Sequence, residues 1–360
     1  MHLSLVGDEA DVAGEALTLP PFSRRGFLGA AGATWFCTLT GHKLHAADGE
    51  ADISKLAADI PVPPKVAEAE AAPQPVARTA AGVRREYWIR AEKTRWTIVP
   101  TRRDQMMDER IHGPITFNAL AYRAYAPNFA RPLGPATIPG PLLQAEVGDS
   151  IVVNFQNATP GPVTMHPHGV FYKPEMDGAY KGKYTDPGGF VQPGQTFTYI
   201  WDARPGTEGI WLYHDHGPMD PIPLYKGLMG PLIIRDPSKP RPDVEFFLFM
   251  HSLQPVATNL PQQFGCMNGR AYAGNTPTLE SRVGQRVAFH VIALDNDFHT
   301  FHIHGHRWVD PDGTVIDTKT MGPGDSFTAE FTEDNPGRWF YHCHVFSHLH
   351  MGMNGWYVVH

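Results

Sequence analysis

Residues 337–344 read GRWFYHCH, and residues 209–216 read GIWLYHDH. Both stretches place a glycine, a tryptophan, a tyrosine and two histidines in the same order and at the same spacing. Short aliphatic and aromatic runs of this kind, introduced by glycine, are typical of β-strands. Because the motif occurs twice, we expect the chain to contain two copies of one β-domain.

Four further blocks repeat in the same order. They are LLQAEVGD (142–149) with TLESRVGQ (278–285), MHPHG (165–169) with FHIHG (301–305), QPGQTF (192–197) with GPGDSF (322–327), and GPLII (230–234) with GWYVV (355–359). The short strands are separated by many of the 35 Gly and 34 Pro residues, which favour turns over long helices. The sequence therefore predicts an all-β chain with two tandem β-sandwich domains.

The chain divides into four predicted segments. Residues 23–28 (SRRGFL) precede a weakly apolar stretch, so residues 1–46 are interpreted as a twin-arginine signal peptide. Residues 47–84 are rich in Ala, Pro and Glu and are predicted to form a flexible linker. A Pro-rich break near residue 238 separates domain 1 (85–238) from domain 2 (239–360).

Charge and hydropathy argue against two classes of partner. The formal net charge is -7 and no dense basic run is present, which argues against nucleic acid. No apolar stretch has the roughly 18 to 20 residues that a transmembrane helix requires, so no membrane span is predicted. The signal peptide predicts a periplasmic or secreted protein.

The histidines form four His-x-His pairs, two in each repeat. Residues i and i+2 of a strand point to the same face, so each pair offers two imidazoles side by side. Eight imidazoles at matching places in two repeats indicate a metal site, and neutral imidazole suits copper, zinc, iron and nickel. Elsewhere, His290 is expected in the core, whereas His306 and His350 are expected either to support neighbouring ligands or to be exposed or packed.

Cys343 selects among these metals. Its side chain points away from the flanking histidines, and His348 and Met353 follow at intervals of five residues. Together with His299, these side chains provide a thiolate, two imidazoles and a thioether, which is the ligand set of a blue-copper electron-transfer site. Cys343, His348 and Met353 are expected on a loop and the strands that flank it. Domain 1 has Asp215 in the place of Cys343, so we expect no blue copper there.

These motifs resemble the copper signatures of multicopper oxidases. The resemblance rests on His299–Gly305 and His342–Met353 in domain 2 and on His166–Gly169 and His214–His216 in domain 1. The absence of a middle domain, together with the export signal, is similar to bacterial two-domain laccases. The resemblance implies two cupredoxin-like Greek-key β-sandwiches.

The resemblance also implies a ligand for every copper. It assigns the type 1 copper to His299, Cys343, His348 and Met353, the type 2 copper to His166 and His302, and the two type 3 coppers to His168, His214, His216, His304, His342 and His344.

The activity implied is that of a laccase. Phenols or aromatic amines would give single electrons at the type 1 copper, with His348 as the entry point, and dioxygen would be reduced to water at the three-copper cluster. The cluster needs histidines from both domains, and the resemblance implies a homotrimer with clusters at subunit interfaces. Asp177 and Tyr172 follow His168 closely, and we expect Asp177 to relay protons and Tyr172 to hydrogen-bond or donate an electron nearby.

Three alternatives remain open on the sequence. A copper nitrite reductase also has two such domains, but Asp215 and the eight cluster histidines argue against it. An exported copper-binding protein would have Met- or His-rich surface tracts, whereas the 12 Met are scattered. A metal-ion oxidase acting on Cu(I) or Mn(II) would use the same chemistry as a laccase.

Overall fold

The structure is a computed structural model that describes residues 82–219 and 221–360. The predicted signal peptide and nearly all of the predicted linker lie outside these residues. Within the described residues, no helix combines the length and the apolar character needed to cross a bilayer.

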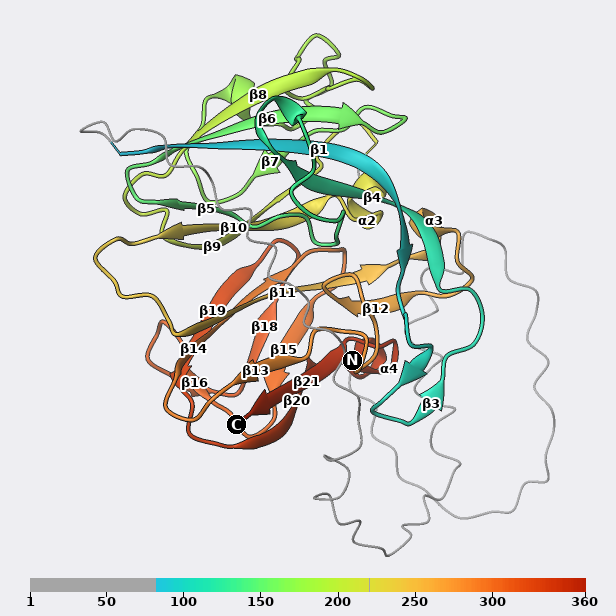
Figure 1. Cartoon of the computed structure of the whole chain (residues 1–360), viewed down its shortest axis with the longest axis vertical. Coiled ribbons are helices and arrows are strands. Elements are labelled where there is room, and N and C mark those ends of the chain that lie inside the picture. Colours follow the sequence, from blue (N-terminus) through green and yellow to red (C-terminus); the bar gives the residue numbers. More distant parts are fainter. Residues whose placement is uncertain (1–81, 220) are drawn as a thin grey trace, which may run out of the picture. The chain divides into compact units, whose positions relative to one another are not determined.

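Domain 1 consists of two four-stranded sheets (Figure 1). The first contains, in spatial order, β4 (Thr116–Tyr125), β1 (Arg84–Thr97), β6 (Ser150–Ala158) and β8 (Thr196–Asp202). The second contains β5 (Leu143–Glu146), β10 (Met229–Arg235), β9 (Gly209–His214) and β7 (His166–Pro167). β1 pairs with β6 and β10 pairs with β5 in parallel, and the other pairs in the two sheets are antiparallel.

Domain 2 repeats this arrangement. One sheet contains β12 (Phe264–Met267), β11 (Val244–Leu253), β14 (Arg286–Ala293) and β19 (Ser326–Thr332). The facing sheet contains β13 (Leu279–Ser281), β21 (Asn354–Val359), β20 (Gly337–Cys343), β15 (His299–Ile303) and β18 (Thr318–Met321). β11 pairs in parallel with β14, as β1 does with β6 in domain 1. β21 pairs in parallel with β13, as β10 does with β5. The prediction of an all-β fold with two sandwiches is therefore confirmed.

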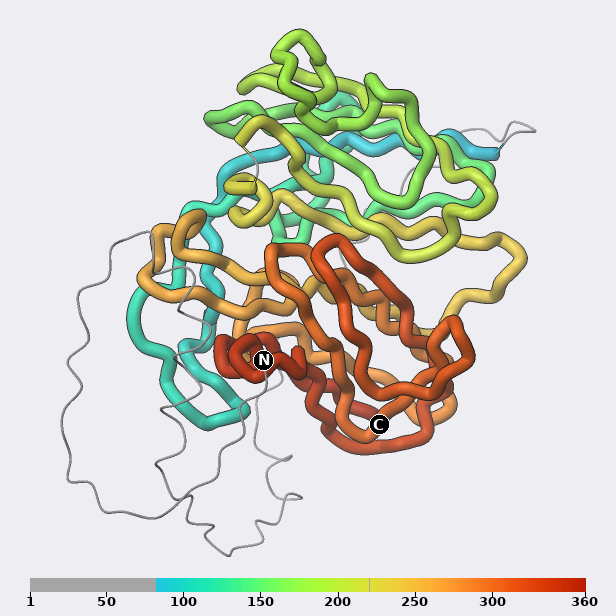
Figure 2. Tube along the Cα trace, turned by 180° about the vertical axis from the view of Figure 1, so that it is seen from behind, coloured from blue at the N-terminus to red at the C-terminus, as the bar shows by residue number. Residues whose placement is uncertain are grey.

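The remaining elements are short. They are two hairpins, β2 (Arg103–Asp104) with β3 (Glu109–Arg110) and β16 (Trp308–Val309) with β17 (Val315–Ile316), the 3-10 turns η2 (Pro127–Phe129) and η3 (Pro174–Met176), and the helices α2 (Ile222–Tyr225), α3 (Pro255–Thr258) and α4 (Phe346–His350). The β2–β3 hairpin lies beside α4 in both views (Figures 1 and 2). Trp356 Nε1 of β21 donates to Gln105 Oε1 of this hairpin at 3.1 Å, which joins it to domain 2.

Each sandwich has an apolar core, and a third cluster joins the two domains. Trp201 and Phe155 are fully buried in domain 1, and Phe289 and Phe301 are fully buried in domain 2. The third cluster contains Phe117 and Ile233 of domain 1 together with Phe249, Leu253 and Phe264 of domain 2. Burial of apolar area is worth roughly 25 cal/mol per Å², so this shared cluster stabilises the two domains together.

Candidate metal centres

The first group of metal-ligand atoms surrounds Cys343, the last residue of β20. Cys343 Sγ lies 3.8 Å from His299 Nδ1 and 3.6 Å from His348 Nδ1, and all three side chains are buried. Met353 is fully buried, and its carbonyl oxygen accepts from Cys343 N–H at 3.0 Å. A nitrogen and a sulfur that share one ion are separated by roughly 3.6 to 3.8 Å at metal–ligand bonds of about 2.1 and 2.3 Å. The spacing and donor types of this group therefore fit a single soft metal ion.

Hydrogen bonds prepare this group as a thiolate site. Burial alone raises the pKa of the Cys343 thiol, but hydrogen bonds to His299 and His348 outweigh burial and lower the pKa to about 6. His299 Nε2 lies 3.0 Å from Asp295 Oδ1, and both side chains are fully buried. Backbone N–H groups of Ser252 and Asp297 donate to the same carboxylate, which holds it in place. A carboxylate behind a ligating imidazole fixes its orientation and strengthens it as a ligand.

His348 does not lie on a loop as the sequence predicted. It lies on α4, because residues 346–350 form one helical turn between β20 and β21. Its outer nitrogen, Nε2, is 3.9 Å from Asp297 Oδ2, and the Asp297 side chain is about half exposed. The outer side of the Cys343 group is therefore acidic.

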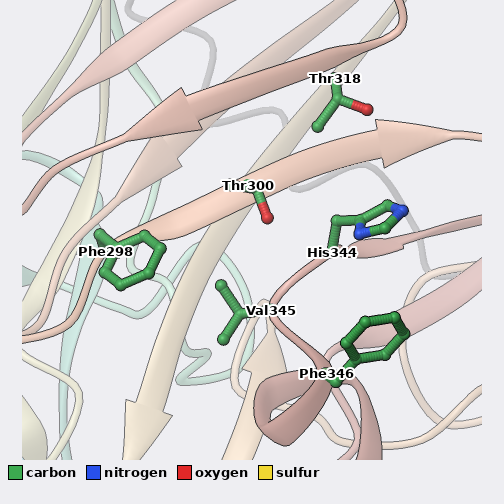
Figure 3. Close-up of a pocket in the computed structure, with 6 residues that line it drawn as sticks. All are labelled: Phe298, Thr300, Thr318, His344, Val345 and Phe346. Carbon is green, nitrogen blue, oxygen red and sulfur yellow. The ribbon is translucent and has the colours of Figure 1, made fainter. Parts of the chain in front are cut away.

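An open depression of about 440 Å³ lies beside this edge (Figure 3). It is lined by Phe298, Thr300, Thr318, His344, Val345 and Phe346. Phe298 and Phe346 are 58% and 66% exposed, and they flank Val345 in Figure 3. Two exposed aromatic rings this close to a candidate redox centre provide an apolar surface for a flat organic molecule.

The second group belongs to domain 1 and contains His166, His168 and His214. His168 Nε2 and His214 Nε2 are 3.1 Å apart, whereas Nδ1 of His166 and of His214 faces a backbone carbonyl. The carbonyls engage Nδ1 and leave Nε2 of these rings for a ligand. Burial lowers the pKa of His168 to about 4 and that of His214 to about 3, so both are neutral and able to bind metal.

The third group repeats this geometry in domain 2 with His302, His304 and His342. His304 Nε2 and His342 Nε2 are again 3.1 Å apart, and Nδ1 of His302 and of His342 again faces a carbonyl. Burial lowers the pKa of His342 to about 4. This group is nearer the surface, because His304 and His344 are exposed.

A fourth histidine accompanies each of these groups. The His216 ring lies 5.6 Å from that of His214, and the His344 ring lies 5.4 Å from that of His342. Within the described residues, the eight histidines thus form two separate half-sites rather than one cluster. We call them the domain 1 half-site and the domain 2 half-site.

Asp177, the candidate proton relay, and Tyr172, the candidate hydrogen-bonding or electron-donating residue, lie beside the domain 1 half-site. Asp177 Oδ1 is 3.1 Å from His166 Nδ1, and the Tyr172 ring lies 6.1 Å from the His166 ring. Burial and a hydrogen bond with Asp177 raise the pKa of Tyr172 to about 12. Lys181 Nζ binds the other carboxylate oxygen of Asp177 at 2.8 Å. The sequence analysis missed Lys181, because residues 177–181 are not helical and their spacing gives no signal for an ion pair.

Asp215 occupies the place in domain 1 that Cys343 occupies in domain 2. Thr164 N–H donates to Asp215 Oδ1 at 2.7 Å, just as Thr300 N–H donates to Cys343 Sγ at 3.4 Å. Asp215 is fully buried. The same backbone pocket therefore holds a carboxylate in one domain and a thiol in the other.

Two family models, both described as multicopper oxidase, match residues 135–239 and 249–360. Together they cover more than half of the chain and include every residue of the three metal-ligand groups. The chain belongs to the multicopper oxidase family. Membership implies copper as the metal, and the thiolate and imidazole donors of the three groups suit it.

Proteins similar to this multicopper oxidase are named for several different activities. It is 33% identical to a probable nitrite reductase-hydroxylamine oxidoreductase fusion protein of Kuenenia stuttgartiensis over 62% of this chain and 28% of that protein. It is 28% identical to ferroxidase HEPHL1 of Mus musculus over 77% of this chain and 29% of that protein. The chain thus spans less than a third of the length of either relative.

Among solved structures, one described as a multicopper oxidase superposes with a TM-score of 0.65 at 25% identity. The superposition covers 80% of this chain and 93% of that one. The two-sandwich architecture is therefore shared over nearly the whole of that chain.

Proposed function

We propose that this multicopper oxidase is a laccase-like enzyme that oxidises phenols or aromatic amines and reduces dioxygen to water. The single observation that carries the proposal is the Cys343 group, which is joined through the backbone to one histidine of the domain 2 half-site on each side. When bound, copper would supply one-electron oxidation of the donor near Cys343 and four-electron reduction of dioxygen at the histidines.

The proposed ligands are those that the family resemblance implies. His299, Cys343, His348 and Met353 would hold the type 1 copper, His166 and His302 the type 2 copper, and His168, His214, His216, His304, His342 and His344 the two type 3 coppers. The Nε2–Nε2 separation of 3.1 Å in each half-site supports the last assignment, because it directs two neutral imidazoles at one point.

The proposed donor site is the outer edge of the Cys343 group. A phenol ring would pack against Phe298 or Phe346, and its hydroxyl would approach His348 Nε2. Asp297, 3.9 Å from this nitrogen, would accept the proton that a phenol releases on losing an electron. At the histidine half-sites, where dioxygen would be reduced, Asp177 would pass protons to the domain 1 half-site. Tyr172 would hydrogen-bond to this half-site or supply an electron to it.

A complete cluster requires both half-sites. We propose that the exposed domain 2 half-site of one chain meets the domain 1 half-site of another, in a homotrimer with three interfacial clusters. We expect the copper-loaded protein to have three times the chain mass by light scattering. A monomeric protein that still contains the full cluster would contradict this assembly. We also propose export of the protein to the periplasm or beyond, on the basis of the predicted twin-arginine signal.

A metal-ion oxidase is the second candidate, and the named ferroxidase relative together with Asp297 at the outer edge favours it. A carboxylate oxygen is also a ligand for divalent ions, so Asp297 would contribute to binding a metal-ion substrate. Nitrite reduction is the third candidate because of the first relative, and an exported copper-binding protein is the fourth.

Oxygen uptake by the copper-loaded protein separates these candidates. We expect uptake with a phenolic donor, a blue visible spectrum, and loss of both to background in Cys343→Ser, because only the thiolate links donor and histidines. Uptake with Fe(II) but not with phenols would favour the metal-ion oxidase. Nitrite consumption without oxygen uptake would favour the reductase, and a blue protein inactive with all of them would favour copper binding.

A further inference from the structure

Domain 2 contains a buried chain of polar side chains behind its half-site. His306 Nε2 lies 3.0 Å from Glu333 Oε1, Tyr357 OH donates to Glu333 Oε2, and Ser281 Oγ lies 2.6 Å from Tyr357 OH. All four residues are at least 94% buried. Phe331, Trp339 and Tyr357 surround the His306 ring at 5.2 to 5.6 Å.

Domain 1 has apolar residues at all four equivalent positions. The repeat aligns His306 with Val170, Glu333 with Ala203, Tyr357 with Leu232 and Ser281 with Ala145. The backbone supports this alignment, because Gly148 N–H donates to Ala203 O just as Gly284 N–H donates to Glu333 O. Ala145, Ala203 and Leu232 are at least 98% buried, so this sandwich packs well without the polar chain.

Burying a His–Glu pair is therefore not a requirement of the fold. Replacing a buried ion pair by apolar residues of similar size is often neutral or stabilising, because desolvation offsets the attraction between the charges. In domain 1, Ala145, Val170, Ala203 and Leu232 are the apolar residues at the equivalent positions. A polar chain retained in only one of two homologous domains points to a task that only that domain has.

The contact at the far side of the imidazole identifies this task. His306 Nδ1 lies 2.8 Å from the carbonyl oxygen of His304, a member of the domain 2 half-site. A carbonyl can only accept, so His306 donates from Nδ1, and the Glu333 carboxylate orients the ring from the other side. Asn335 holds the next peptide, because its Nδ2 donates to Gly305 O at 3.0 Å and its N–H donates to Glu333 Oε1.

The two half-sites differ in how much support their neighbours give. His168 of domain 1 is partly buried, and a Cβ atom placed on Gly324 of domain 2 would lie only 3.8 Å from its ring. Within one chain His304 is exposed, so the described residues of that chain restrain its ring less. The hydrogen bond from His306 to the His304 carbonyl restrains the backbone that orients the His304 imidazole.

We propose that His306 and Glu333 are positioning residues that hold the His304–Gly305 turn and so orient His304 for copper binding. The inference rests on the proposed function, since it requires the histidine half-sites to bind copper. Residues that support metal ligands by hydrogen bonds typically contribute about 10- to 100-fold to metal affinity. We expect an effect of this size on the copper bound by histidines and none on the copper bound by Cys343.

The test compares two variants with a matched control. Glu333→Gln keeps the shape of the side chain and removes the charge that orients His306. A fourfold variant gives domain 2 the apolar residues of domain 1: Ser281→Ala, His306→Val, Glu333→Ala and Tyr357→Leu. The control is Glu245→Gln, which removes the carboxylate from another His–Glu pair of domain 2, since His290 Nε2 lies 3.0 Å from Glu245 Oε1.

Competition of the holoenzyme with a chelator, followed by copper analysis, measures the affinity of the histidine sites. The blue absorption of the Cys343 site reports whether domain 2 is folded. We expect about 10- to 100-fold weaker binding at the histidine sites in both variants, with blue absorption retained, and wild-type binding in the control.

Two results would overturn the inference in different ways. Wild-type affinity in both folded variants would show that the polar chain has no positioning role and would leave the proposed function intact. A wild-type protein that binds copper only at the Cys343 site would overturn the proposed function and the inference together.

Discussion

The partner of each imidazole nitrogen decides what that histidine can do in this chain. In the half-sites, Nδ1 of His166, His214, His302 and His342 faces a backbone carbonyl, which leaves Nε2 for metal. In the Cys343 group the roles are reversed, because Nδ1 of His299 and of His348 faces the thiol. The same residue type thus presents opposite nitrogens, since the surrounding backbone and carboxylates hold different ring atoms.

Asp177 provides a test at this scale. We expect Asp177→Asn to lower oxygen turnover by about 10²- to 10⁴-fold, the range typical for loss of a positioned proton donor. Copper content should be unchanged, because asparagine keeps the backbone carbonyl that faces His166 Nδ1 at 2.6 Å. Oxygen uptake and copper analysis check both expectations. Turnover equal to wild type at every pH measured would rule out the relay. Wild-type turnover of Tyr172→Phe would rule out the proposed role of Tyr172 as a hydrogen-bonding partner or electron donor.

At the scale of elements, one glycine turn follows the first His-x-His pair of each repeat. Gly169 and Gly305 have φ values of +73° and +71°, which L side chains rarely adopt. A Cβ atom on Gly169 would lie 2.0 Å from the ring of Trp211, and one on Gly305 would lie 2.7 Å from the ring of Trp339. The tryptophan of each quoted strand motif therefore packs against the turn that carries the ligands, which explains why both features repeat together.

Gly169→Ala should therefore disrupt the domain 1 half-site. The matched control is Gly194→Ala, because Gly194 also has a positive φ of +81° but has no atom within 4 Å of an added Cβ. The control should lose about 1 kcal/mol of unfolding free energy from backbone strain alone. Gly169→Ala should lose clearly more, together with histidine-bound copper. Urea unfolding and copper analysis would check this, and equal losses in the two variants would show that contact with Trp211 does not matter.

For the whole molecule, an ion-pair network ties the last strand of domain 1 to the first strand of domain 2. Arg235 of β10 donates to both carboxylate oxygens of Glu245 of β11, at 2.8 and 3.0 Å. Burial alone raises the pKa of Glu245, but His290 and Arg235 outweigh it and lower the pKa from 4.5 to about 2. Beside it, Phe247 stacks on His290 at 4.7 Å.

This lowered pKa predicts how stability depends on pH. The folded state holds the ionised form of Glu245, so its contribution is fully present above pH 4.5 and is lost as the pH falls towards 2. A shift of this size corresponds to roughly 3 kcal/mol of unfolding free energy. We expect Glu245→Gln to be up to that much less stable than wild type at pH 7, and the difference to disappear near pH 2. Urea denaturation at several pH values measures it, and a difference independent of pH would contradict the assigned role.

The sequence by itself determined the fold class, the repeat and the identity of the histidine and cysteine groups. Strand periodicity and local spacing carry this information, because His-x-His in a strand brings two rings together whatever surrounds them. Local spacing was not sufficient for α4, because residues 346–350, which include His348, form a helical turn rather than a loop.

Only the tertiary structure decided which groups stand behind the ligands. Glu333 is 27 residues from His306 in sequence, and Arg235 and Glu245 meet across two domains. The first contact depends on packing between segments that are far apart in sequence, and the second depends on the packing of β10 against β11 across the domain boundary. Residue spacing encodes neither. The same is true of the separation of the eight histidines into two half-sites, since it follows from where the two sandwiches place their matching edges.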